Sequence, residues 1–353
     1  MTGDRPRPRD ATPEIAAAYR RFADEEARGR SPLYAELARG VADDPEVIAF
    51  LRTLPPDKRQ PNLLLAASRH LFGTADGWAA FRRTLLDQPA AVAALMRRRS
   101  TQTNEPGRCA TLLPVLARLP QPLALIEVGA SAGLCLLPDF YAYHYDGYDC
   151  PGRRIAAADR DAPVLRCRAD PATPLPDGPP QVVWRAGLDL NPLDATDAGD
   201  VSWLETLVWP GQAERLERLQ RALAVAARHR PRVVRGDLRR DLAALAAEAP
   251  PDATLVVFHT AVLSYVASTA DRDAFATAVA ALGARWVANE SPRVLPAIAA
   301  RAGAPPATGC FLLSVDGRPC AWTDPHGTAI EWIGDEPANH ESYLHSHGGR
   351  TNS

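Results

Sequence analysis

Long hydrophobic runs are missing from this chain of 353 residues. No stretch approaches the roughly 18 uninterrupted apolar residues that a membrane-spanning helix needs. Residues 1–10, MTGDRPRPRD, are polar and lack the apolar core of a secretory signal. We therefore expect a cytoplasmic protein without a membrane partner.

An excess of charge of either sign is also missing. The chain has 40 basic and 42 acidic residues, which gives a formal net charge of −2. Lys58 is the single lysine, and every other basic residue is arginine. Because non-specific binding to nucleic acid depends on net positive charge, we expect a small-molecule substrate and no nucleic acid partner. The sequence makes no prediction of the oligomeric state.

Metal-binding patterns are absent from the sequence as well. The six cysteines form no C-x-x-C pair, and none has a histidine at the spacing of a zinc finger. Free cysteines usually behave as small buried hydrophobic residues. We therefore predict buried thiols in a reducing compartment and no metal site.

The first third of the chain has the pattern of a helical bundle. Apolar residues recur at helical spacing, and Pro, Gly and Asp separate the segments. We predict an all-helical cap domain over residues 1–120, with helices at 14–29, 31–44, 45–54, 60–72, 78–87 and 90–99.

Beyond residue 120, short apolar runs alternate with amphipathic segments. This alternation predicts an α/β fold with a doubly wound, mostly parallel sheet over residues 121–335. The expected strands are 123–128, 181–190, 231–237, 253–261 and 284–290, and the expected helices are 213–229, 238–249 and 271–283.

Three further segments complete the predicted organisation. Residues 309–324 predict a hairpin at the edge of the sheet, with its turn at Asp316-Gly317. We interpret residues 138–180 as an inserted β segment with two extra short strands. Residues 336–353 form a polar tail.

A turn rich in small residues, EVGASAG, follows the first strand at residues 127–133. We expect a helix to begin after it, so that backbone N–H groups at a helix N-terminus face a ligand. A phosphate-binding P-loop is excluded, because Leu134 and Cys135 replace its Lys and Ser/Thr. Two interpretations stay open. Either Ser131 is the nucleophile of a serine hydrolase with a G-x-S-x-G elbow, or the turn binds a nucleoside-containing cofactor.

The pattern E-x-G-x-S-x-G resembles the first motif of class I S-adenosylmethionine-dependent methyltransferases, with serine in place of the middle glycine. Three later strand ends carry the same resemblance: GLDLNP at 187–192, RGDL at 235–238 and HT at 259–260. The resemblance spans residues 121–324. It implies a Rossmann-like, methyltransferase-like domain with S-adenosylmethionine as cofactor.

The same resemblance implies roles for individual residues. The turn would hold the methionine end of the cofactor, Asp189 the ribose and Asp237 the adenine amine. The implied cofactor-binding residues are Glu127, Gly129, Ser131, Gly133, Asp189 and Asp237. Asp146 and Asp149 lie nearer to the turn in sequence and stay as competing ribose ligands. We prefer Asp189 because an apolar strand leads into it.

The whole chain also resembles an uncharacterised family of bacterial proteins that is frequent in actinobacteria. The resemblance rests on RSTQTNE at 99–105, the glycine turn, WRAGLDLNPLD at 184–194, LVWP at 207–210, RGDL, FHTAVLSY at 258–265 and Asn289-Glu290. This family supplies no activity.

The polar segment at residues 99–108 separates two apolar helices just before the first strand. We expect it to fold over the carboxyl end of that strand and to line the acceptor pocket through Thr103, Asn104, Glu105 and Arg108. A capped turn is the alternative, because Asn104 suits a helix cap. If the segment binds ligand, substituting Asn104 or Glu105 by Ala should abolish binding and leave the melting temperature nearly unchanged.

His259 and Glu290 follow the fourth and fifth expected strands and are candidate catalytic residues. Either side chain could accept a proton from a hydroxyl or amine acceptor. The alternatives are a hydrogen-bonded core histidine, and a helix cap or a partner of Arg293 for Glu290. Three functions follow: a methyltransferase, a hydrolase that uses Ser131, and a non-catalytic Rossmann-like binding protein.

Overall fold

The fold comes from a computed structural model that describes residues 12–102, 104–147, 152–266 and 268–334. Two candidate residues named from the sequence, Thr103 and Asp149, lie outside the described residues, and so does the predicted tail at 336–353.

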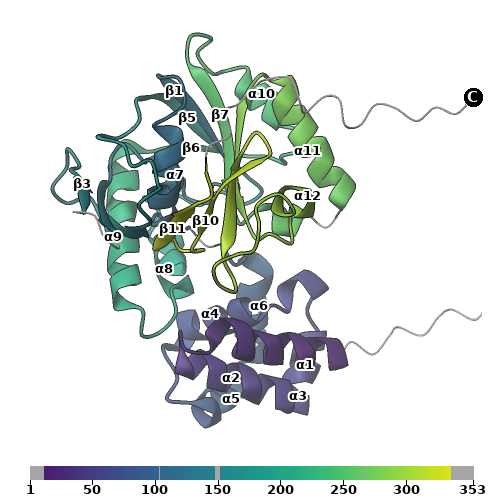
Figure 1. The fold of residues 1–353 in the computed structure, drawn as a ribbon. Helices are drawn as coiled ribbons and strands as arrows, with labels where there is room; N and C mark the ends of the chain where they lie inside the picture. The colour runs from purple at the N-terminus through teal and green to yellow at the C-terminus, as the bar shows by residue number, and fades with distance from the viewer. Residues whose placement is uncertain (1–11, 103, 148–151, 267, 335–353) are drawn as a thin grey trace, which may run out of the picture.

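The residues described between 12 and 116 form helices and contain no strand (Figure 1). Ser31 and Asp44 begin two of the helices, because their side chains accept hydrogen bonds from backbone N–H groups of the first turn. The helices are α1 (Thr12–Arg21), continued by a π-helical turn (Phe22–Ala27), α2 (Pro32–Asp43), α3 (Pro45–Arg52), a 3₁₀ turn (Pro56–Lys58), α4 (Pro61–Phe72), α5 (Trp78–Asp87), α6 (Pro89–Arg98) and α7 (Arg108–Leu116).

The described part of the chain after residue 120 contains one mixed sheet of 11 strands, most of them paired in parallel. Its spatial order is β3-β2-β4-β11-β10-β9-β8-β7-β1-β5-β6. The strands are β1 (Leu123–Val128), β2 (Ala142–Gly147), β3 (Arg153–Ile155), β4 (Val164–Ala169), β5 (Val182–Asp189), β6 (Arg232–Arg235), β7 (Thr254–Thr260), β8 (Arg285–Glu290), β9 (Phe311–Val315), β10 (Arg318–Thr323) and β11 (Ala329–Trp332).

Five consecutive strands of this sheet, in the order β6-β5-β1-β7-β8, are parallel. Every residue of the central strand β1 is buried, because helices cover both faces of the sheet. One face carries α7, α8 and α9, and the other carries α10, α11 and α12 (Figure 1). Their bounds are α8 (Ala198–Leu207), α9 (Ala213–His229), α10 (Leu242–Ala246), α11 (Thr269–Ala281) and α12 (Pro296–Ala299). The predicted α/β class is confirmed at this level.

The predicted hairpin forms, but it does not lie at an edge of the sheet. Strands β9 and β10 turn at Asp316-Gly317, and β10 then pairs with β11, which itself pairs with β4. The inserted segment contributes three strands instead of two, and they extend the sheet beyond the hairpin. The sequence interpretation missed β11 because its pairing with β4 joins residues far apart in the chain.

The helix expected after the glycine turn is absent. Residues Leu134–Leu136 form a single 3₁₀ turn, and Pro138 follows before β2. Proline has no backbone N–H and disfavours a helical conformation in the residue before it, so a helix cannot continue through this segment. The turn therefore offers no helix N-terminus to a ligand.

Candidate functional site

The glycine turn after β1 is a tight bend that only small residues permit. Gly129, Ser131 and Gly133 have φ values of 74°, 53° and 71°. A Cβ atom on Gly129 would lie 2.3 Å from Val262 Cγ2, and one on Gly133 would lie 3.0 Å from Pro231 Cγ. The close contacts with Val262 and Pro231 are therefore enough to explain why both positions need glycine, without any bound ligand.

Asp189 lies directly against this turn. At the carboxyl end of β5, its Oδ2 accepts a hydrogen bond from Ser131 N at 2.8 Å, and its Oδ1 accepts one from Asn191 N at 2.7 Å. Ser131 Oγ is buried and has no hydrogen-bond partner in the described residues. The fold thus places Asp189 beside the glycine turn, although the inserted segment separates the two in the sequence.

The polar segment before α7 folds over this place, as expected. Asn104 Nδ2 donates to Ala130 O at 3.2 Å. Gln102 Nε2 donates to Asn191 O at 2.9 Å and lies 3.5 Å from Asp189 Oδ1. A cavity of about 20 Å³ lies between Gln102, Asn104 and helices α8 and α9. It has room for about one water molecule.

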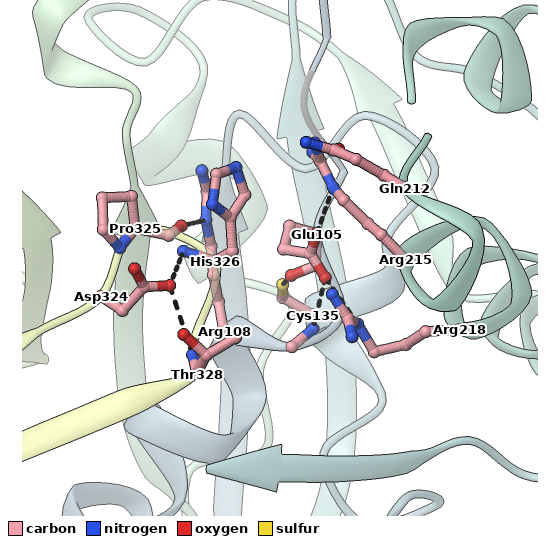
Figure 2. A network of polar contacts seen from close by, with 11 residues as sticks. Glu105, Arg108, Cys135, Gln212, Arg215, Arg218, Asp324, Pro325, His326 and Thr328 are labelled. Atoms are coloured by element: carbon pink, nitrogen blue, oxygen red, sulfur yellow. Dashed lines mark hydrogen bonds and ion pairs between the residues drawn. The ribbon is translucent and has the colours of Figure 1, made fainter. Parts of the chain in front are cut away.

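Glu105 is buried between two arginines of α9. Arg215 Nε lies 2.7 Å from Glu105 Oε2, and Arg218 Nε lies 3.0 Å from Oε1, which also accepts from Gly107 N (Figure 2). Burial favours the protonated acid, but the two guanidinium groups outweigh it and hold the pKa of Glu105 below its usual value. Removal of this charge is therefore expected to destabilise the fold, contrary to the nearly unchanged melting temperature expected from the sequence.

Arg108, at the start of α7, connects the end of β7 to the turn between β10 and β11. Its Nη1 donates to Thr260 O and Oγ1 at 3.1 Å each. Its Nε donates to Pro325 O at 2.8 Å (Figure 2). His326 lies beside it, where burial and then the charge of Arg215 lower its pKa to about 4. These donors already have partners in the chain, which gives Arg108 a structural role.

Glu127 is the most unusual acid of the site. Its side chain is buried at the end of β1, and its Oε2 has no hydrogen-bond partner in the described residues. Burial raises the pKa of Glu127 well above its usual value, and the charge of Asp189 adds to the shift against the opposing effect of Arg108. A buried carboxyl group with an unsatisfied oxygen is typical of functional sites, although structural networks produce it as well.

His259 and Glu290 belong to a hydrogen-bonded network on the other face of the sheet. Trp286 Nε1 donates to His259 Nε2 at 3.0 Å, and His259 Nδ1 lies 2.7 Å from Glu290 Oε1. Because an indole N–H only donates, Nε2 is an acceptor and Nδ1 carries the proton. Glu290 Oε1 also accepts from Val262 N and Leu263 N. With the ring fully buried and both nitrogens engaged, this geometry favours a structural role for His259.

Strand alternation separates the candidate residues into two sets. Glu127 pairs in register with Phe258, whereas His259 pairs with Val128, so Glu127 and His259 point to opposite faces of the sheet. Asp237 lies apart from both sets after β6, where hydrogen bonds from Arg239 lower its pKa to about 2. The fold therefore does not gather all the predicted residues around one cavity.

Several residues of the site were missed in the sequence. Gln102 belongs to the polar segment but was not selected. Arg215 and Arg218 lie on the polar face of an amphipathic helix, where arginines are usually solvated. Trp286 lies in an expected strand without any pattern that indicates its hydrogen bond to His259.

The described residues form no helix with the length and apolar character that crossing a bilayer requires. They also contain no group of three or more His, Cys, Asp or Glu side chains arranged to hold a metal ion.

Residues 16–332 match a protein family described as "Uncharacterized protein conserved in bacteria (DUF2332)". Because the match covers well over half of the sequence, the chain belongs to this bacterial family, and that resemblance is confirmed. Neither a curated protein nor a solved structure matches the chain. The methyltransferase resemblance stays a prediction.

Proposed function

We propose that this member of the bacterial family binds S-adenosylmethionine at the glycine turn and transfers its methyl group to a small molecule. The domain that contains the turn is then a Rossmann-like domain. The cofactor supplies the electrophilic methyl group, and the chain binds, orients and shields the reactants.

The order of the parallel strands supports this proposal. Among the five consecutive parallel strands, β5 and β6 follow β1 in the chain and lie on one side of it, and β7 and β8 then follow on the other side. In open α/β sheets with such a reversal, ligands bind outside the carboxyl ends of the strands near the reversal. The glycine turn lies at the carboxyl end of β1, beside this reversal.

The observation that carries the proposal is the contact between Asp189 and the turn. Asp189 Oδ2 lies 2.8 Å from Ser131 N, so a carboxylate and a small-residue bend lie next to each other. A carboxylate in this position can accept hydrogen bonds from ribose hydroxyls, as in dinucleotide-binding sites. The methionine end of the same ligand would then reach the bend.

The chemistry of the described residues fits this cofactor. Glu127 Oε2 and Ser131 Oγ are buried without hydrogen-bond partners among the described residues, and they could accept from an ammonium group or donate to a carboxylate. Gln102 Nε2 lies 3.5 Å from Asp189 Oδ1 and would compete with a ribose hydroxyl for this oxygen. We therefore propose that Gln102 leaves Asp189 when the cofactor binds, and that its amide then becomes available to the ligand.

The contacts of the catalytic candidates leave Glu290, and not His259, as the proposed residue that accepts a proton. Both ring nitrogens of His259 form hydrogen bonds within the chain, whereas Glu290 Oε2 is buried and has no partner in the part of the chain that the structure describes. Of the residues expected to line the pocket of the methyl acceptor, Asn104 remains as a candidate for contact, because it covers the turn. We propose that Asn104 orients the acceptor.

Calorimetric titration with S-adenosylmethionine and S-adenosylhomocysteine tests the proposal. We expect saturable heat for both ligands and at least tenfold weaker binding by Asp189→Asn. The variant replaces the charged carboxylate, which accepts hydrogen bonds from the ribose hydroxyls, with a neutral amide. Asp194→Asn is the matched control, since Asp194 is an exposed acid in the same loop whose carboxylate accepts hydrogen bonds from the nearby Thr196 N and Oγ1. No heat with either ligand would remove the proposal.

One observation favours the hydrolase as a second candidate. Ser131 has a positive φ of 53°, and a nucleophile elbow likewise holds its serine on a strained turn. However, Ser131 Oγ has no hydrogen bond to a histidine within the described part of the chain. Labelling by a fluorophosphonate probe that disappears in Ser131→Ala would establish the hydrolase. Binding of the cofactor without turnover on any acceptor would instead favour a non-catalytic binding protein.

A further inference from the structure

A second and larger cavity lies among the helices of residues 12–98, away from the sheet. Its volume is about 210 Å³, and residues of α2, α4, α5 and the connection between α4 and α5 line it. A cavity of about 150 Å³ accommodates benzene, so this one has room for a ring with a small substituent. Part of its wall is apolar and is formed by Leu37, Leu65 and Phe81.

Two hydroxyl groups in this cavity lack hydrogen-bond partners. Tyr34 and Ser68 both line it, and only 3% and 6% of their surfaces are exposed. Neither Tyr34 Oη nor Ser68 Oγ has a partner in the described residues. A serine inside a helix often donates to the carbonyl group four residues earlier, but Ser68 does not. A buried polar group without a partner is unfavourable, so a ligand that satisfies both hydroxyls would be stabilised.

Arg69 brings a positive charge to the same cavity. Its Nη1 donates to Thr206 O and Val208 O at the end of α8, and it forms no ion pair with a carboxylate among the described residues. Burial raises the pKa of Tyr34, and both the charge of the Arg69 guanidinium and its contact with the Tyr34 hydroxyl oppose this shift. The charge of Arg69 therefore acts on the same region as the Tyr34 hydroxyl.

We propose that this cavity binds a small monocarboxylate with an apolar body. The hydroxyls of Tyr34 and Ser68 donate to the carboxylate, and Arg69 balances its charge. The apolar body contacts Leu37 and Phe81. This orientation keeps the carboxylate at the buried end and away from Asp76, an exposed acid that also lines the cavity.

This site is independent of the proposed cofactor site. Its lining residues lie between positions 33 and 84, whereas the glycine turn and Asp189 belong to the sheet. Arg69 and the end of α8, which also borders the small cavity near Gln102, lie between the two sites. Binding of a carboxylate here can therefore be tested whether or not S-adenosylmethionine binds.

Benzoate is the probe for this site, measured by calorimetry on the full chain, with benzyl alcohol and benzylamine as neutral and cationic analogues. We expect saturable binding of benzoate, at least tenfold weaker binding of benzyl alcohol and no binding of benzylamine. Absence of benzoate binding, or equal or tighter binding of either analogue, would overturn the proposal.

Variants that remove the unpartnered hydroxyls test whether benzoate binds in this cavity, and we expect them to keep the fold intact. We expect Tyr34→Phe and Ser68→Ala each to weaken benzoate binding about tenfold, and to leave the melting temperature unchanged or higher, because neither loses a hydrogen bond within the chain. Ala80→Leu, which projects a larger side chain into the cavity, should abolish binding. Ala79→Leu is its control on the exposed side of α5. Unchanged affinity in Tyr34→Phe and Ser68→Ala would contradict the site.

Discussion

Glu105→Gln tests how firmly the polar segment is held over the glycine turn. Only 2% of the Glu105 side chain is exposed, and it receives hydrogen bonds from Arg215, Arg218 and Gly107 N. Removing one partner of a buried ion pair typically costs about 3–5 kcal/mol. The two arginines are 18% and 19% exposed and can regain some hydration, so we expect the lower end, about 3 kcal/mol.

Urea unfolding of the wild type and the variant measures this loss. The matched control is Glu217→Gln on the same helix, because Glu217 pairs with Arg221 in an exposed i,i+4 geometry that contributes about 0.5 kcal/mol or less. The arginines lower the pKa of Glu105 in the folded state, so its contribution is complete above the ordinary glutamate pKa and disappears as the pH falls through the folded value. The wild type and variant should therefore converge in acid. A loss no larger than that of the control at pH 7 would refute the reasoning.

Three other predictions concern the ends of the strands. Because burial raises the pKa of Glu127, its protonated form is favoured in the folded state, and Glu127→Gln should gain stability relative to the wild type as the pH rises from 4 to 8 in thermal unfolding. Trp286→Phe leaves His259 Nε2 without its donor and should lose about 2 kcal/mol in urea unfolding, whereas an unchanged midpoint would place that nitrogen in contact with water. Gly129→Ala should lose about 3 kcal/mol, and adding Val262→Ala should restore only part of it, since the clash disappears but a positive φ still costs about 1 kcal/mol. Full recovery in the double variant would show that the backbone at this position is unstrained.

Local patterns predicted the parts of the fold that depend on local sequence. The run LALIEV forms β1 with the expected bounds, and the segment at 213–229 forms α9. Both have one dominant signal, a buried apolar run in β1 and an amphipathic period in α9. The short strand β11 has no such signal, because its place depends on β10 and on the distant β4.

The candidate site was predictable only in part for the same reason. A strand ending in Asp189 was visible in the sequence, and its contact with Ser131 follows from the pairing of β1 with β5. The partners of Glu105 lie 110 and 113 residues away, and no local pattern identifies them. A catalytic role and a hydrogen-bonded core position likewise both stayed open for His259, since nothing near it in the chain indicates the donor on Trp286.

A crystal structure of the protein grown with S-adenosylhomocysteine tests the central proposal most directly. The proposal predicts the ribose hydroxyls within hydrogen-bond distance of Asp189, the amino-acid end at the turn of residues 129–133, and Gln102 withdrawn from Asp189. A ligand bound elsewhere, with the contact between Gln102 and Asp189 intact, would contradict it.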